Sequence, residues 1–257
     1  MLVIVASRHD KAAEALVANW AAHGHSVSLL TPEDLSVVGW RHYLSSIDVG
    51  DRGESTTSST SFSSAVVGGV AISTTGCANA LDQITGVLTR LPSIFEQELL
   101  HIVPDDRAYI ATEMNAFLIA WLSSLKCPVL NRPTPTYLLG PAWRPEQWVY
   151  AAAQLGIPVR PVRRQSSMSA NVCAQVLEKS SVKVTVVGDR CLGEVEKTLA
   201  SHARRIADAA EVDLLTVHFS SSESPAEFLG ADLWTDISAP DVGDAILEYL
   251  SGGDAKC

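Results

Sequence analysis

Three polar side chains occupy positions at which α/β proteins usually bind ligands. Arg90, Asn131 and Arg132 follow short apolar stretches that predict β-strands. Open α/β sheets bind ligands beyond the carboxyl ends of their strands, and guanidinium or amide groups there hold a phosphate or carboxylate. We therefore take Arg90, Asn131 and Arg132 as candidate substrate-binding residues, with a small-molecule carboxylate as the candidate ligand. In the alternative, structural interpretation, Asn131 and Arg132 stabilise a proline-rich turn.

Other segments with motif-like spacing lack a required residue. The turn after the first predicted strand, Ser7 to Lys11, has no glycine, which excludes the dinucleotide-binding fingerprint. The segment Gly188 to Gly193 has the glycine spacing of a phosphate loop, but Glu194 stands where a lysine would meet the phosphates. The sequence also has no G-x-S-x-G elbow, so it gives no support to α/β-hydrolase chemistry.

Composition and charge narrow the class of protein. The chain has 257 residues, 47% of them hydrophobic, which is enough to build a buried core. Its formal net charge of −10 argues against nucleic-acid or anionic-membrane partners. Its five cysteines form no C-x-x-C pair, so neither a zinc site nor a disulfide framework is predicted. No basic region precedes the first apolar stretch, and no apolar run approaches the about 20 residues of a bilayer span, so we expect a soluble, cytoplasmic protein.

The first half of the sequence predicts alternating strands and helices. Leu2–Ala6 and Val27–Leu30 are predicted strands, and Asp10 stands at the N-cap position of a helix between them. A long helix is predicted from about Pro104 to Leu125. Nine of the ten residues from Ser55 to Ser64 are serine or threonine, which predicts a loop. This order indicates an open parallel sheet.

The second half is predicted to begin with antiparallel strands. Apolar and polar residues alternate from Val182 to Val186, and Gly188-Asp189 suits a hairpin turn. The elements predicted after this hairpin are a helix from Val195 to Ala210, a strand from Leu214 to Phe219 and a helix from Val242 to Leu250. The expected fold class is therefore α/β, with an open parallel sheet followed by a mixed α+β domain.

Several segments occur in an order that is found in a known protein family. In the first half they are Gly86–Pro92, Glu113–Phe117, Pro128–Pro133 and Leu155–Val159. In the second half they are Val186–Asp189, the helix around His202, Asp213–Phe219 and Phe228–Asp236. This order resembles the ATP-grasp superfamily, in particular RimK-like carboxylate–amine ligases, which join a carboxylate to an amine with ATP. The resemblance implies a pre-ATP-grasp-like α/β domain at residues 1–162 and an ATP-grasp-like C-terminal domain at residues 163–257.

Compared with that family, the chain is shortened and its nucleotide-binding parts are degenerate. The family has a substantial nucleotide-binding lid subdomain where this chain has only residues 163–181, a stretch with no glycine and one lysine. Where the family has an Asp and then a Glu-x-Asn sequence for magnesium, this chain has His218 and then Gly230, Asp232 and Thr235. Of these, only Asp232 is a ligand for a hard cation.

These observations lead to three hypotheses. The leading one is a non-catalytic ATP-grasp-like subunit or scaffold without a cofactor, which partners another protein, such as a complete ligase, or forms a homo-oligomer in a biosynthetic pathway. The second is an active ATP-dependent carboxylate–amine ligase that uses ATP and magnesium. The third is a small-molecule anion-binding module built on Arg90, Asn131 and Arg132. Whether the chain is an enzyme stays open at this stage.

Overall fold

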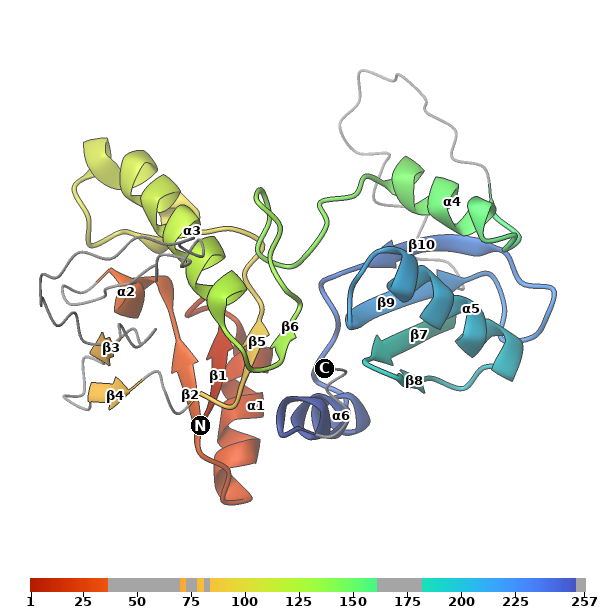
Figure 1. The fold of residues 1–257 in the computed structure, drawn as a ribbon, viewed down its shortest axis with the longest axis horizontal. Coiled ribbons are helices and arrows are strands. Elements are labelled where there is room, and N and C mark those ends of the chain that lie inside the picture. Colours follow the sequence, from red (N-terminus) through yellow and green to blue (C-terminus); the bar gives the residue numbers. More distant parts are fainter. Residues whose placement is uncertain (37–69, 73–77, 81–83, 161–181, 253–257) are drawn as a thin grey trace, which may run out of the picture.

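The computed structural model describes residues 1–36, 70–72, 78–80, 84–160 and 182–252, which form two main β-sheets with helices around them (Figure 1). The predicted loop from Ser55 to Ser64 and the segment 163–181, where the resemblance predicts a missing lid, lie outside the described residues. The strands β3 (Val70–Ile72) and β4 (Ala78–Ala80) pair with each other as a small antiparallel sheet.

The first main sheet has four parallel strands in the order β2-β1-β5-β6. Its strands are β1 (Leu2–Val5), β2 (Val27–Leu30), β5 (Gly86–Thr89) and β6 (Val129–Leu130). All four residues of β1 are buried, because both faces of this strand are covered, and its sequence is correspondingly apolar throughout. The predicted open parallel sheet is confirmed.

Helices cover both faces of the first sheet. The helix α1 (Lys11–Ala22) begins at the N-cap Asp10, as predicted, and shares a hydrophobic cluster with the even-numbered residues of β1. The helix α3 (Arg107–Ser124) shares another cluster with Val3 and Val5 on the opposite face. The connections contain the helix α2 (Pro32–Leu35) and the 3-10 turns η2 (Glu96–Glu98) and η3 (Pro104–Asp106).

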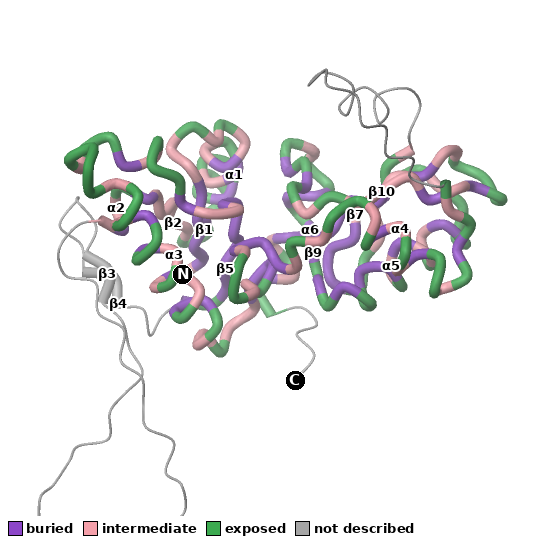
Figure 2. The backbone as a smooth tube through the Cα atoms, turned by 90° about the horizontal axis from the view of Figure 1, so that it is seen from above, coloured by how far each residue is buried: buried purple, intermediate pink, exposed green. Residues whose placement is uncertain are grey.

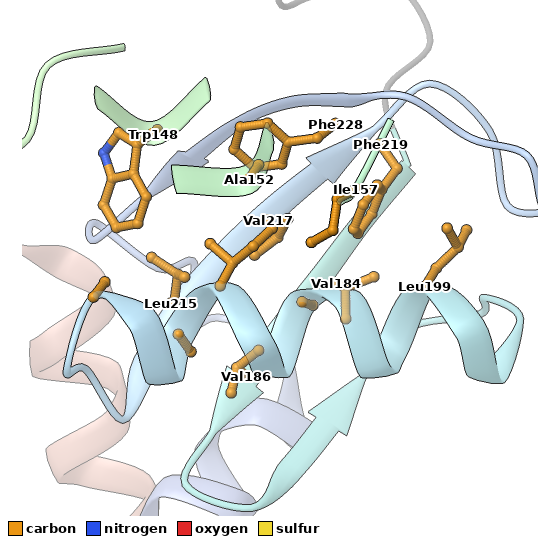
Figure 3. Packing of buried hydrophobic residues seen from close by; sticks show 14 of the residues in the cluster. Trp148, Ala152, Ile157, Val184, Val186, Leu199, Leu215, Val217, Phe219 and Phe228 are labelled. Atoms are coloured by element: carbon orange, nitrogen blue, oxygen red, sulfur yellow. The ribbon is translucent and has the colours of Figure 1, made fainter. Parts of the chain in front are cut away.

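The second main sheet has four antiparallel strands in the order β10-β9-β7-β8. Its strands are β7 (Val182–Val187), β8 (Arg190–Leu192), β9 (Leu214–Phe219) and β10 (Phe228–Asp232). The helices α4 (Pro145–Gln154) and α5 (Lys197–Ala209) pack with it in one cluster, in which Trp148 and Ala152 of α4 meet strand residues such as Val217 (Figure 3). The predicted hairpin at Gly188-Asp189 is confirmed, since it joins β7 to β8.

The helix α6 (Pro240–Leu250) follows the second sheet in sequence and packs in a hydrophobic cluster that contains residues of both sheets. Ile246 and Leu250 share a cluster with β1 and α1, and a Cβ atom on Gly86 of β5 would lie only 2.6 Å from the backbone oxygen of Leu250. Figure 2 shows buried residues, in purple, along the strands of both halves. The division into domains 1–162 and 163–257 stays a prediction, and α4 and α6 each pack across it.

Candidate functional site

The side chain of Arg90 is buried just beyond β5 and is held by two distant parts of the chain. Its Nε donates a hydrogen bond to Asp10 Oδ2 at 2.7 Å, and its Nη1 donates to the backbone oxygen of Thr235 at 2.8 Å. Only 6% of the Arg90 side chain and 7% of the Asp10 side chain are exposed. Solvent ions screen such a buried ion pair weakly. Together, the two hydrogen bonds of Arg90 connect the loop after β1 to the segment after β10.

Trp234 lies over the Arg90 guanidinium and borders a pocket. The Arg90 Cζ atom is 4.5 Å from the centre of the indole ring, within the range of a cation–π contact. The pocket has a volume of about 570 Å³. Its lining consists of Ser7, His9, Asp10, Lys11, Ala12, Arg90, Trp234 and Asp236. Among the residues that the structure describes, none accepts a hydrogen bond from Arg90 Nη2.

The pocket lies where the strand order of the first sheet reverses. From β1 the chain continues to β2 on one side, whereas β5 lies on the other side of β1. Residues 7–12 follow β1 and Arg90 follows β5, so the pocket wall comes from the carboxyl ends of two adjacent strands. Open α/β sheets bind ligands at such a switch point. All three candidate residues follow strands of this sheet, as the sequence predicted, and of the three Arg90 is the one that lines the pocket.

The second sheet presents a polar face beside this pocket. The residues of β7 and β9 that alternate with the buried core residues are Lys183, Thr185, Thr216 and His218. Lys183 is opposite His218 in the register, and Thr216 is opposite Asp232 of β10. Thr216 Oγ1 also donates a hydrogen bond to Thr235 Oγ1 at 3.2 Å. The polar face therefore continues to the segment that holds Arg90.

Charges on the polar face act on neighbouring titratable groups. Burial lowers the pKa of His218, the positive charge of Lys183 lowers it further, and the negative charge of Asp232 acts in the opposite direction. Burial raises the pKa of Tyr137, and the charge of Asp232 adds to this effect. Lys183, His218, Tyr137 and Asp232 therefore belong to one electrostatic neighbourhood.

Asp236 connects the polar face electrostatically with the pocket. Its pKa is lowered chiefly because Ser238 donates hydrogen bonds from its backbone and side chain, the backbone N–H reaching Asp236 Oδ1 at 3.0 Å. The charges of Lys183 and Arg90 lower this pKa as well. Because Asp236 lines the pocket, its carboxylate brings a negative charge to the same opening as the Arg90 guanidinium.

Asn131 lies at a junction of the two sheets and is not part of the pocket lining. It is 2% exposed. Its Nδ2 donates to the backbone oxygen of Leu214 at 2.8 Å, and its Oδ1 accepts the backbone N–H groups of Leu214 at 2.7 Å and Asp213 at 3.1 Å. These contacts fasten the end of β6 to the start of β9. The substrate-binding role of Asn131 stays a prediction.

Arg132 also lies outside the pocket lining, with an exposed side chain. Its two Nη groups each donate to a backbone oxygen at 3.2 Å, that of Leu125 and that of Cys127. These bonds tie the turn after β6 to the end of α3, as the structural interpretation of this turn expects. The pocket lining thus includes Arg90 but neither Asn131 nor Arg132, and the binding role of Arg132 stays a prediction.

Sequence reasoning identified Arg90 but not the residues around it. Asp10 was recognised only as a helix N-cap, which it is, although its second carboxylate oxygen pairs with Arg90. No local pattern indicates that Trp234 lies on the Arg90 guanidinium. For Lys183 a usable signal existed, because the alternation along β7 places this lysine on the face opposite the core.

Comparison with solved structures identifies the fold as that of the ATP-grasp ligases. The macrocyclase MdnC from Microcystis aeruginosa MRC, bound with precursor peptide MdnA, matches with a TM-score of 0.63 and 12% identity over 97% of this chain and 99% of that chain. The Chryseobacterium gregarium RiPP-associated ATP-grasp ligase, in complex with ADP and a leader and core peptide, matches with a TM-score of 0.61 and 10% identity over 97% and 96%.

The ATP-grasp ligase PsnB, complexed with its minimal precursor, matches with a TM-score of 0.54 and 13% identity over 96% of this chain and 98% of that chain. No family model and no curated protein matches the sequence. The fold predicted from the sequence resemblance is confirmed. Within the described residues, every helix is too short or too polar to cross a membrane.

ATP and Mg²⁺ are the groups that this fold implies, and the polar face of the second sheet is the place to test their fit. Mg²⁺ prefers oxygen ligands in octahedral geometry and is held by carboxylates together with phosphates. This face offers the carboxylate of Asp232 beside the imidazole of His218 and the ammonium group of Lys183. Across the described ranges, no three His, Cys, Asp or Glu side chains are grouped to hold a metal ion. The described part of this face therefore offers Mg²⁺ few oxygen ligands.

Proposed function

We propose that the chain is a non-catalytic protein with an ATP-grasp fold that works with a partner protein in a biosynthetic pathway, in the cytoplasm and without a cofactor of its own. The observation that carries this proposal is the position of Lys183, opposite His218 and close enough to lower the pKa of that imidazole. The Lys183 ammonium group repels a divalent cation at Asp232, and the two carboxylates near this ammonium group, Asp232 and Asp236, are few for an octahedral Mg²⁺ site.

The pathway that we propose is one in which a precursor peptide is modified, because the similar structures contain such peptides. MdnC is bound with a precursor peptide, and the Chryseobacterium gregarium ligase is in complex with a leader and core peptide. We infer that this chain assists the modification of such a peptide, beside a complete ligase or as a homo-oligomer. Its contribution would be to bind and position the other components, a role supported by the observation that, among the described residues, no three His, Cys, Asp or Glu side chains are grouped to hold a metal ion.

Isothermal titration calorimetry with ATP and Mg²⁺ tests the proposal. We expect no heat of binding at micromolar ATP, whereas PsnB titrated in the same buffer gives the positive control. Magnesium-dependent binding of ATP in the micromolar range would overturn the proposal. That result would favour the alternative function, an active ATP-dependent carboxylate–amine ligase.

A second candidate function is the binding of a small carboxylate, which the pocket beside Arg90 favours. The Arg90 guanidinium lines the pocket and would donate to a carboxylate, and the partly exposed Trp234 ring would be a stacking surface for an aromatic group. NMR titration with acetate, benzoate and indole-3-acetate tests this. We expect affinity to rise along the series, and Trp234→Ala to remove that rise. Absence of binding by all three compounds would exclude the pocket as a carboxylate site.

A further inference from the structure

Exposed apolar side chains are concentrated around the start of α3. Within the described residues, six large hydrophobic side chains are exposed, and four of them lie in the segment 95–109. They are Phe95, Leu100, Val103 and Tyr109, whose exposed fractions range from 52% to 66%. We call these four residues the α3 patch. A gathering of apolar side chains on a protein surface is typical of an interaction site, whereas isolated ones are common everywhere.

Hydrogen bonds hold the segment of the α3 patch in place. Arg107, the first residue of α3, donates from Nε to the backbone oxygen of Ile102 at 2.9 Å and from Nη2 to that of Leu100 at 3.0 Å. Asn115, two turns further along α3, accepts the backbone N–H of Ile94 at 2.9 Å and donates to its oxygen at 3.0 Å. The patch is therefore fixed against the helix in advance of binding, which lowers the entropic cost of docking a partner.

Beyond the patch, the exposed face of α3 carries small side chains. Beyond Tyr109, the exposed positions of the helix include Thr112, Ala116 and Ala120 at four-residue spacing. The inner face buries the large side chains, among them Trp121. Side chains four apart form a ridge along a helix, and small ones allow the axis of a partner helix to come close. The surface is thus suited to a helix lying along α3.

The charges around the α3 patch indicate what the partner helix carries. Four exposed carboxylates lie within or next to the segment 95–109 in sequence, those of Glu96, Asp105, Asp106 and Glu113. The only lysine or arginine from residue 93 to residue 125 is Arg107, whose guanidinium is bonded to backbone oxygens. The whole chain has a formal net charge of −10. A partner that buries the apolar side chains must bring positive charge to this acidic rim.

We propose that the α3 patch binds a basic amphipathic helix of a partner protein. The apolar face of that helix covers Val103 and Tyr109, and its lysine and arginine side chains meet the carboxylates of Asp105 and Glu113. The proposal rests on the proposed function in one respect, namely that the chain works with a partner. It names the docking surface and the chemistry of the segment that docks there.

A designed peptide is the probe for this surface. We would use a fluorescein-labelled helix of about 18 residues, or about five turns, with leucine along one face and lysine elsewhere. A peptide with glutamate in place of lysine and a scrambled lysine peptide are the controls. We expect fluorescence anisotropy to show binding of the amphipathic lysine peptide, weaker binding of the scrambled peptide and no binding of the glutamate peptide.

Variants then locate the binding to the patch. The double variant Val103→Ser/Tyr109→Ser should weaken binding at least about tenfold, since exposed apolar anchors carry most of the affinity of such contacts. The matched control is Tyr150→Ser on α4, where the side chain is 67% exposed, and this variant should bind as the wild type does. Asp105→Asn/Glu113→Gln should weaken binding and flatten its dependence on salt.

The other outcomes contradict the proposal. Wild-type affinity in Val103→Ser/Tyr109→Ser, or equal binding of the three peptides, would remove the patch as the docking surface. If the wild type sediments as a dimer and this double variant as a monomer, the occupant is a second copy and the proposed partner is wrong. Calorimetry with ATP addresses the proposed function separately, so the two proposals fail by different measurements. Unchanged circular dichroism of each variant shows that its fold is retained.

Discussion

The side chain of Asn131 forms two hydrogen bonds with the backbone of Leu214, one in each direction. Its Nδ2 donates to the Leu214 oxygen at 2.8 Å, and its Oδ1 accepts the Leu214 N–H at 2.7 Å. One amide thus pairs with the first residue of β9 as a neighbouring strand would. This contact joins the end of the parallel sheet to the antiparallel sheet and gives Asn131 a structural role that is independent of any ligand.

Removing this contact should destabilise the fold. Asn131→Ala leaves the buried N–H and oxygen of Leu214 and the partly buried N–H of Asp213 without those partners, so we expect a loss of about 2–4 kcal/mol in the free energy of unfolding. Urea denaturation measures it. The control is Asn19→Ala on the exposed side of α1, which should change stability by less than about 0.5 kcal/mol. Equal stability of the two variants would show that the Asn131 contacts contribute nothing.

The buried pair of Arg90 and Asp10 predicts unequal effects of two arginine substitutions. Arg90→Met leaves Asp10 buried without its counter-ion and should cost about 3–5 kcal/mol in the free energy of unfolding. Adding Asp10→Asn should recover part of that loss, because asparagine keeps the N-cap acceptor for the Ala13 N–H without a charge. Arg132→Met, at an exposed arginine, is the control and should cost less than about 1 kcal/mol.

A double-mutant cycle at positions 90 and 10 tests whether Arg90 and Asp10 stabilise each other, as the 2.7 Å between Nε and Oδ2 indicates. The effects of Arg90→Met and Asp10→Asn should be strongly non-additive, because each residue is the main partner of the other. Additive losses in urea denaturation would mean that the two charges are stabilised by other groups.

The polar face predicts a specific pH response of His218. Burial and the charge of Lys183 lower the pKa of His218 from its ordinary value of 6.5, so the folded protein binds this proton less readily than the unfolded chain does. The contribution of His218 to stability is therefore complete above pH 6.5 and is lost as the pH falls from there through the folded-state pKa. His218→Gln should reduce this acid destabilisation in urea melts at a series of pH values.

NMR titration of the His218 ring tests the cause of this shift. Lys183→Met should raise the pKa of His218, whereas Asp232→Asn should lower it further. Lys126→Met, at an exposed lysine before β6, is the matched control and should leave the titration unchanged. An unaltered His218 titration in Lys183→Met would disprove the electrostatic neighbourhood on which the proposed function depends.

Two glycines with positive φ allow the stability cost of backbone strain to be measured separately from the cost of a steric clash. Gly188 has φ 55°, and a Cβ atom there would lie 2.5 Å from the ring of Tyr249. Gly24 has φ 84° but no atom within 4 Å of such a Cβ. Gly24→Ala should cost about 1 kcal/mol of backbone strain, and Gly188→Ala should cost clearly more, about 2–4 kcal/mol. Equal losses on thermal melting would mean that Tyr249 moves aside freely.

Local signals in the sequence predicted most of the regular structure. The apolar stretch before Asp10 and the spacing after it predicted β1 and α1, and the alternation along β7 predicted the antiparallel hairpin. These patterns are local because strand alternation and helix capping depend on residues that are close in sequence. The predicted helix from Pro104 to Leu125 likewise matches η3 and α3 closely.

The parts that the sequence did not predict depend on tertiary packing. The apolar face of α4 is evident, but nothing in it indicates that Trp148 packs against the second sheet rather than the first. The stacking of Trp234 on Arg90 joins two residues that follow strands of different sheets, β10 and β5. Asn131 was correctly placed at a strand end, yet its partner Leu214 comes from the other half of the chain. Local patterns contain no information about such partners.

The position of α6 has a consequence for the order in which the protein folds during synthesis. This helix packs in the same cluster as β1 and α1, although almost the whole chain separates them. Until α6 has left the ribosome, Leu2 and Ile4 have α1 as a neighbour but lack the side chains of Ile246 and Leu250. The hydrophobic cluster on this face of the first sheet is therefore completed only after α6 has been synthesised.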